Sequence, residues 1–278
     1  MAEPQNDDGA EHLGFSEHDV EDIEEAARLR APMIYEVVRR EGEEEMRRPL
    51  TSLWWSGVAA GLSISFSVLA EAILRRHLPD TSWRPLVAGF GYSVGFLIVV
   101  LARQQLFTEN TITVVLPIAA NPSLHNFIRL GRMWSIVFVA NMVGTLFAAL
   151  FCTFTPVLSP GLLGTMRNLA EGMMSLDWGT MFFRGISAGF LIAAMVWLIP
   201  SAEGAQFLVI TLMTWLIAIG GFTHIVVGSM EAFLLVVHGD IGIGRMFLDF
   251  FIPALLGNVI GGTVLFGLIS YAQVAKEV

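Results

Sequence analysis

The apolar residues of this chain are grouped into long stretches that fill most of residues 51–278. A helix needs about 20 mostly apolar residues to cross the hydrocarbon of a bilayer, and six segments satisfy that requirement. In chain order they are Leu53–Leu74, Leu86–Ala102, Trp134–Phe154, Met181–Pro200, Phe207–Val237 and Phe250–Ala275. The pattern therefore predicts an all-α polytopic membrane protein with six transmembrane helices.

Polar residues and glycines interrupt this pattern at two places. A polar stretch with Arg103, Gln104, Gln105, Thr108, Glu109 and Asn110 separates Ala102 from the apolar piece Ile112–Ala120, which is too short to cross a membrane alone. The segment Phe207–Val237 is long enough for a span but contains Gly220, Gly221, His224, Gly228 and Glu231. Non-helical backbone at membrane depth is tolerated only where protein or a water-filled cavity surrounds it. We therefore expect two broken helices that face the interior of the molecule.

Short motifs recur in the two halves of the chain, one set in residues 51–155 and the other in residues 178–276. Phe107-Thr108 at the first break matches Phe222-Thr223 at the second. Two further pairs are Asn141-Met142-Val143-Gly144-Thr145 with Asn258-Val259-Ile260-Gly261-Gly262-Thr263, and Gly57-Val58-Ala59-Ala60-Gly61 with Gly185-Ile186-Ser187-Ala188-Gly189. Because each repeat holds three spans, the two must enter from opposite sides, which predicts an inverted repeat whose breaks meet near the midplane.

Composition supports a bilayer as the solvent, since 54% of the residues are hydrophobic and the mean hydropathy is +0.64. The net charge of −9 is confined to the amino-terminal 50 residues, which hold 15 of the 25 acidic residues and 6 of the 16 basic ones. We expect residues 1–31 to form an acidic cytoplasmic tail, residues 32–50 an amphipathic interfacial helix, and residues 51–278 the membrane domain. The acidity argues against a nucleic-acid partner.

The amino-terminal segment lacks the basic and apolar regions of a cleaved signal, so we expect it to be retained. The basic residues are nearly balanced between the two faces, with a slight excess that favours cytoplasmic termini. The charged run Glu41–Arg48 fits a solvated linker or a contact with a cytoplasmic partner, and the sequence leaves both open.

Two residues at the breaks are the strongest candidates for contact with a solute. An imidazole titrates near physiological pH, so His224 can donate a proton to an entering anion or stabilise it by hydrogen bonding. The Thr108 hydroxyl can donate or accept, and the half-helix that follows it directs backbone N–H groups toward the break. The alternatives are a buried structural histidine and a simple helix cap at Thr108.

Three other ionisable residues, Arg103, Glu109 and Glu231, lie near the breaks. We interpret them as a charge-balanced set that braces the broken helices, with proton coupling as the alternative. Cys152 is the single cysteine and lies in an apolar run, so no disulfide and no cysteine metal site is expected. The separated histidines and dispersed acids offer neither a catalytic arrangement nor a metal or cofactor site, which argues against an enzyme.

The segments Ala102–Thr111 and His224–Ser229 resemble the divergent YfdC-like branch of the formate/nitrite transporter family, and three motifs resemble the family as a whole. They are Leu106-Phe107-Thr108 at the first break, Gly221-Phe222-Thr223-His224 at the second, and Gly257-Asn258-Val259-Ile260-Gly261-Gly262 in the last span. The resemblance covers roughly residues 32–275. It implies an aquaporin-like protomer, a homopentamer with one pore in each protomer, and a bacterial inner-membrane location with cytoplasmic termini. Members of the family pass small monovalent anions such as formate, nitrite or hydrosulfide.

Carried over by position, the resemblance makes Thr108 and His224 the central polar pair, with proton exchange at the histidine. Hydrophobic constrictions are implied at Leu106, Phe107, Tyr92, Phe96 and Ile217, and a dry constriction passes a neutral acid more readily than its anion. The chain departs from the family where a vestibule lysine is expected near Met173, and where asparagines are expected near Gly228 and at Gly189. Arg103 and Arg184 are the candidates to replace the lysine charge.

Two alternatives remain at this point. The missing lysine also fits an aquaporin-like path for a small neutral solute. The acidic tail would also suit a membrane scaffold or sensor that acts through a cytoplasmic partner.

Overall fold

The computed structural model describes residues 29–277, and every regular element in this range is helical. The expected acidic tail lies outside the described residues, apart from its last three positions. In the first half the helices are α2 (Ala31–Arg47), α3 (Leu50–His77), α4 (Arg84–Leu101), α5 (Asn110–Thr113), α6 (Leu116–Ala120) and α7 (Leu124–Phe154). In the second half they are α8 (Pro160–Met174), α9 (Trp178–Leu198), the 3-10 turn η2 (Ile199–Ser201), α10 (Gln206–Ile219), α11 (Ile225–His238), α12 (Ile243–Arg245), the π-helical η3 (Met246–Phe251), α13 (Ile252–Val259), the π-helical η4 (Ile260–Gly267) and α14 (Leu268–Val274).

The helices are consistent with the expected six spans, and the two expected breaks follow α4 and α10. Five continuous segments among the described residues are long and apolar enough to cross a bilayer: α3, α4, α7, Trp178–Ser201 and Ile243–Val274. The fifth predicted span is the pair α10 and α11, with 14 residues in each half. The second span is α4 followed, after the first break, by the short α5 and α6.

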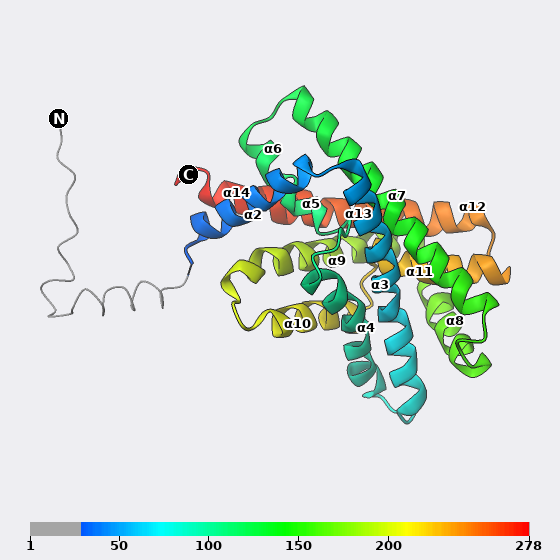
Figure 1. Ribbon diagram of the computed structural model, residues 1–278. Coiled ribbons are helices and arrows are strands. Elements are labelled where there is room, and N and C mark those ends of the chain that lie inside the picture. The colour runs from blue at the N-terminus through cyan, green and yellow to red at the C-terminus, as the bar shows by residue number, and fades with distance from the viewer. Residues whose placement is uncertain (1–28, 278) are drawn as a thin grey trace, which may run out of the picture.

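The two repeats form two bundles that cross in the middle of the molecule (Figure 1). In the first bundle α3 packs against α4 and α7, and in the second α9 packs against α13, η4 and α10. The half-helix after each break packs against the other bundle. In the first repeat α5 packs against α9 and η4, and in the second α11 packs against α7. This exchange brings the two breaks together.

Small residues allow the helices within each bundle to approach closely. A Cβ added at Gly61 would collide with the backbone oxygen of Asn141, and one added at Gly189 would collide with that of Asn258. Helices that touch at backbone level are typical of membrane bundles, where packing replaces the hydrophobic effect between helices. The equivalent contacts in both bundles confirm the glycine motifs of the repeat.

Helix α2 occupies most of residues 32–50, where an amphipathic interfacial helix was expected, and ends at Arg47. Proline at its second position suits a first helical turn, and Tyr35, Val38, Gly42 and Met46 form its buried face. That face packs against α5, α6 and α14, so α2 lies beside the last helix and the short helices that follow the first break (Figure 1).

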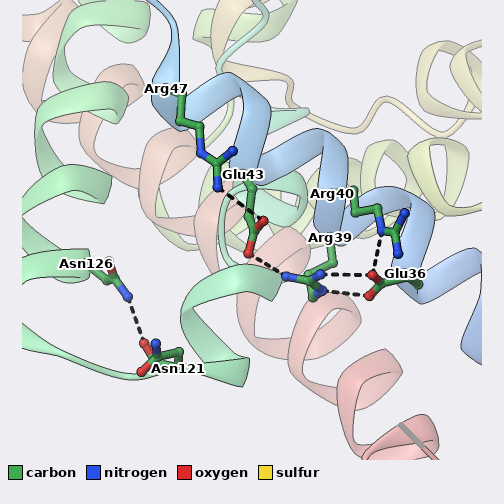
Figure 2. Close-up of polar contacts among 7 residues, drawn as sticks. All are labelled: Glu36, Arg39, Arg40, Glu43, Arg47, Asn121 and Asn126. Carbon is green, nitrogen blue, oxygen red and sulfur yellow. Dashed lines mark hydrogen bonds and ion pairs between the residues drawn. The ribbon is translucent and has the colours of Figure 1, made fainter.

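The opposite side of α2 is charged (Figure 2). Arg39 donates two hydrogen bonds to the Glu36 carboxylate, at 2.7 and 2.9 Å, and a third to Glu43 at 2.5 Å. Arg40 also donates to Glu36, at 2.6 Å. These bonds from Arg39 and Arg40 lower the pKa of the Glu36 carboxyl to about 2.

Helix α8 was not predicted and connects the two repeats. Ser159 caps its amino-terminal end by accepting a hydrogen bond from the Leu162 backbone N–H, and Pro160 occupies the first helical position. The helix buries Met166, Ala170 and Met174 and packs against α11 and α3. It therefore closes one side of the space beside the second break.

Candidate functional site

The first broken helix ends in a motif that reverses the chain direction. Helix α4 ends at Leu101, and Arg103 follows in the left-handed region at φ 51°. The Gln104 N–H then donates to the Val99 carbonyl at 2.9 Å, and the Arg103 N–H donates to that of Val100 at 3.1 Å. This is the Schellman arrangement, in which glycine is the usual left-handed residue. Arginine holds the strained position here.

The second break repeats this arrangement. Helix α10 ends at Ile219, and Gly221 takes the left-handed position at φ 60°. The Phe222 N–H donates to the Ile217 carbonyl at 3.0 Å, and the Gly221 N–H to that of Ala218 at 3.1 Å. Because glycine has no Cβ, this turn forms without the strain that Arg103 carries.

An asparagine from the third span of each repeat clamps the chain beyond the break. Asn141 accepts from the Phe107 N–H at 2.9 Å and donates to the carbonyls of Gly57, at 2.8 Å, and Gln105, at 2.9 Å. In the second repeat Asn258 accepts from Ile225 at 2.9 Å and donates to the carbonyls of Gly185 and Thr223, at 2.9 and 2.8 Å. Both amides are fully buried, so each clamp satisfies backbone groups that have no access to water.

The clamps also fix the register between the repeats, and they correct one prediction. Gln105 and Thr223 are equivalent positions in the two repeats, because the clamp asparagine of each repeat donates to their carbonyls. Phe107-Thr108 is therefore not the equivalent of Phe222-Thr223, and that part of the predicted repeat is wrong by three residues. The equivalent of His224 in the first repeat is Leu106.

His224 and Thr108 meet where the two breaks come together. His224 Nε2 lies 2.7 Å from Thr108 Oγ1, and both residues are buried. His224 is also the N-cap of α11, since its Nδ1 accepts from the Val227 N–H at 3.2 Å. A nitrogen that accepts carries no proton, so the neutral ring is protonated at Nε2 and donates to Thr108.

Aromatic and aliphatic side chains surround this pair. The Phe96 ring contacts the His224 ring edge-on, with centroids 5.0 Å apart, and Tyr92 lies 5.5 Å from Phe96. Ile217 and Leu106 are also buried. Phe107 instead contacts Trp134 and Phe138 of α7, with centroids 5.7 and 5.1 Å away. The structure therefore brings Tyr92 and Phe96 to the histidine and directs Phe107 toward α7.

A cavity of about 290 Å³ extends from His224 toward the far end of α3, and we call it the distal cavity. Its ionisable or polar lining residues are Glu71, Arg75, Tyr92, Asn168, Arg184, Thr223, His224 and Glu231. Ile217 and Met173 line it as well. Glu71 and Arg75 form an ion pair at 2.9 Å. The lining thus combines two acidic and two basic residues with the central histidine.

A second cavity of about 110 Å³ lies on the side of α2, and we call it the α2-side cavity. Glu41 and Glu45 of α2 line it together with Arg103, Gln105 and Glu109. Arg103 pairs with Glu41 at 3.1 Å, and Gln105 donates to Glu45 at 2.6 Å. Two bonds therefore attach α2 to the chain just after the first break, and three carboxylates face a single arginine.

The predicted bracing set does not exist as one group. Arg103 and Glu109 line the α2-side cavity, whereas Glu231 lines the distal cavity with Glu71 and Arg75. Arg103 pairs with Glu41 of α2, because its left-handed position turns the chain toward that helix. Of the two arginines considered as replacements for the vestibule lysine, Arg184 lines the distal cavity beside Met173.

Sequence reasoning missed the clamp function of Asn141 and Asn258 and the ion pair of Glu71 with Arg75. The recurring asparagine motif was the available signal for the clamps. Glu71 was the one acidic residue within its span, with Arg75 four residues later, which is the spacing of a helical ion pair. Among residues 29–277 no group of three or more histidine, cysteine, aspartate or glutamate side chains could hold a metal ion.

Comparisons with known proteins agree with this architecture. The family model described as formate/nitrite transporter matches residues 32–272. The inner membrane protein YfdC of Escherichia coli K12 is 42% identical over 248 residues, which cover 89% of this chain and 80% of that protein. The nitrite transporter NirC of Salmonella typhimurium is 28% identical over 227 residues, covering 77% of this chain and 80% of NirC.

Two solved structures share the fold. One, described as an FNT family ion channel, has a TM-score of 0.71 at 22% identity and covers 87% of this chain and 98% of its own. The other, a pentameric formate channel with formate bound, has a TM-score of 0.69 at 18% identity and covers 81% of this chain and 98% of its own. The family model covers most of the chain, and the described residues contain five helices long and apolar enough to cross a bilayer. This chain is therefore a multi-pass membrane protein that belongs to the formate/nitrite transporter family.

Proposed function

We propose that this protein is a channel for a small monovalent anion or its weak acid, of the formate, nitrite or hydrosulfide type, and that the solute exchanges a proton at His224. The observation that carries the proposal is the 2.7 Å contact between His224 and Thr108, placed where the two breaks meet and at the inner end of the distal cavity. A polar pair within an otherwise apolar constriction is suited to a solute that crosses as a neutral acid.

The chemistry of the pair supports this function. The neutral imidazole donates through Nε2 to Thr108, so the Thr108 hydroxyl proton is available to an oxyanion in the path. Arg75 and Arg184 place positive charge in the distal cavity, where the vestibule lysine is absent. Leu106, Tyr92, Phe96 and Ile217 form the dry surroundings that disfavour an unprotonated ion. Phe107 contributes indirectly, by holding the loop against α7.

The relatives suggest how the chain assembles and where it resides. A pentameric formate channel shares the fold, and a relative with 42% identity is named an inner membrane protein. We infer a homopentamer in the inner membrane, with one path per protomer and both termini in the cytoplasm. The α2-side cavity then opens to the cytoplasm and the distal cavity to the other compartment, and a protein partner of the acidic tail would be cytoplasmic.

The first test is uptake of formate, nitrite and hydrosulfide into proteoliposomes across a range of pH. We expect uptake by the wild-type protein to rise as the pH falls, and to be lost in His224→Ala and in protein-free vesicles. His224→Asn is the matched control for structure, because asparagine is a good N-cap and maintains the start of α11 without an imidazole. It should be folded like the wild type and yet fail to transport.

Two outcomes would contradict the proposal. Uptake that is insensitive to pH and unchanged in His224→Asn would indicate a path for a neutral solute. If none of the three solutes crosses faster than in protein-free vesicles, transport of the family's small anions is excluded, and a scaffold that acts through the acidic tail becomes the reading to test.

A further inference from the structure

His224 has no free ring nitrogen in this structure. Nδ1 accepts from the Val227 N–H, and Nε2 faces Thr108. To take up a proton at Nδ1, the ring must release the backbone N–H that it caps, and a buried unpaired N–H is unfavourable. If a second group gives the solute a proton ahead of His224, the solute reaches the histidine already neutral, and the imidazole need not supply the first proton.

Glu231 occupies the position for such a group. His224, Gly228 and Glu231 follow one another at intervals of four and three residues on α11, and all three line the distal cavity. Seven residues of helix rise by about 10 Å, so Glu231 lies about that far from His224 along the axis, on the side from which a solute in the distal cavity arrives.

Among the described residues, the Glu231 carboxyl has no basic partner, unlike the carboxyl of Glu71, the other acidic residue of the distal cavity. Glu71 pairs with Arg75 at 2.9 Å, whereas no arginine, lysine or histidine nitrogen in residues 29–277 lies within 4.0 Å of the Glu231 carboxyl. The other ionisable groups of the cavity are Glu71 and Arg75 from α3, Tyr92 from α4, Arg184 from α9 and His224 from α11 itself. Helix α8 contributes Asn168 and no ionisable group, and α7 and η3 contribute none.

We propose that Glu231 is the proton-transfer group of the distal cavity, which converts the arriving anion into its neutral acid before it reaches Phe96 and His224. The Glu231 carboxyl gives its proton to the anion, which leaves a carboxylate on the protein and a neutral acid in the cavity. The neutral acid enters the dry constriction at lower cost than the anion does. Glu231 then recovers a proton from the solution on the distal side, and the reverse sequence serves flux in the other direction.

The dimensions and charges of the cavity suit this transfer. A volume of about 290 Å³ holds several water molecules at about 30 Å³ each, enough for a hydrogen-bonded chain to the carboxyl. Arg75 and Arg184 attract the anion to the same space, so donor and acceptor meet there. This inference rests on the proposed function, because it requires a solute that travels as a weak acid.

The test compares Glu231→Gln with Glu171→Gln in full-length protein reconstituted in phosphatidylcholine vesicles. Glu171 lies on α8, is exposed and does not line the cavity, so its variant reports any general effect of losing one acidic residue. We expect formate and nitrite uptake by Glu231→Gln to fall on the order of tenfold or more and to lose its rise at acid pH. Glu231→Asp should retain the pH dependence at a lower rate, and Glu171→Gln should match the wild type.

A second measurement does not depend on transport. Infrared difference spectra recorded as nitrite is added should show the loss of a protonated carboxyl band in the wild type and no such change in Glu231→Gln. If Glu231→Gln keeps the wild-type pH profile, or if the nitrite-dependent loss of the carboxyl band still occurs in this variant, Glu231 is not the donor, even where uptake still depends on His224. If wild-type protein transports none of the anions but the nitrite-dependent band is specific to Glu231, the proposed function fails and the proton-transfer site stands.

Discussion

The two breaks have the same backbone and different side chains. Each ends a helix with a Schellman turn, and each is held by an asparagine that makes three hydrogen bonds to the backbone. The left-handed residue, however, is Arg103 in the first break and Gly221 in the second. The N–H groups of Gln104 and Phe222 close the two turns. Two residues later, the first break has Leu106 and the second has His224. The frame is therefore symmetric, whereas the imidazole of the central pair is present only in the second break.

The comparison distinguishes the hydrogen bonds that fix the backbone of both breaks from the side chains that differ between them. The hydrogen bonds that define the frame involve backbone atoms and two asparagines, so other side chains in the loops are free to differ. The first break has Leu106 at the position of the histidine and is attached to α2, whereas the second carries the imidazole and lines the distal cavity. Variants of paired positions can test how far the two breaks are independent.

The largest effect is expected from the clamps. Asn258→Ala removes three buried hydrogen bonds, each with a net contribution of about 0.5–1.5 kcal/mol, and leaves backbone groups unpaired. We expect a loss of about 2–4 kcal/mol, measured as a lower thermal midpoint of the detergent-solubilised protein, and an equal loss for Asn141→Ala. Asn258→Asp retains the acceptor for Ile225 and should lose less. A markedly smaller effect of Asn141→Ala would show that the first break depends on α2 instead.

A smaller effect, of opposite sign in the two repeats, is expected at the left-handed positions. Gly221→Ala introduces a Cβ at φ 60° and should destabilise the protein by roughly 1–2 kcal/mol. Arg103→Gly removes the corresponding strain at φ 51° but also the ion pair with Glu41, which is exposed and contributes less than about 1 kcal/mol. The thermal midpoint should therefore fall in Gly221→Ala and stay level or rise in Arg103→Gly. A fall in both would mean that the Glu41 contact outweighs the strain.

Much of this frame was predictable from the sequence, for physical reasons that can be named. Glycines at equivalent positions mark helices that touch at backbone level, and the recurring asparagines mark buried amides that need backbone partners. The polar interruptions after Ala102 and Gly220 marked the breaks themselves. The contact between Thr108 and His224 followed from placing both breaks near the midplane.

The register between the repeats was not predictable in the same way. The clamps bind the carbonyls of Gln105 and Thr223, and a carbonyl is present whatever the side chain, so matching Phe-Thr pairs by letter gave the wrong alignment. The left-handed Arg103 was also hidden, because that conformation ordinarily calls for glycine. Its partner Glu41 lies 62 residues away, on an element whose docking only the tertiary structure reveals.

The smallest effect is expected from acid, and it should reach only the side of the molecule that α2 covers. The pKa of Glu36 is lowered to about 2 by the bonds from Arg39 and Arg40, below its ordinary 4.5. The contribution of this network is therefore complete above about pH 4.5 and is lost as the pH falls toward 2. A spin label can be attached at the exposed Met33, as Met33→Cys in a Cys152→Ser background. Its mobility should increase as the pH falls from about 4.5 to 2. The increase should be smaller in a Glu36→Gln variant, because the carboxylate is already absent there. A second label at exposed Glu171, beside the distal cavity, should not respond. An equal response at both sites would mean that acid loosens the whole bundle, and that α2 is not a separately docked cover of the first break.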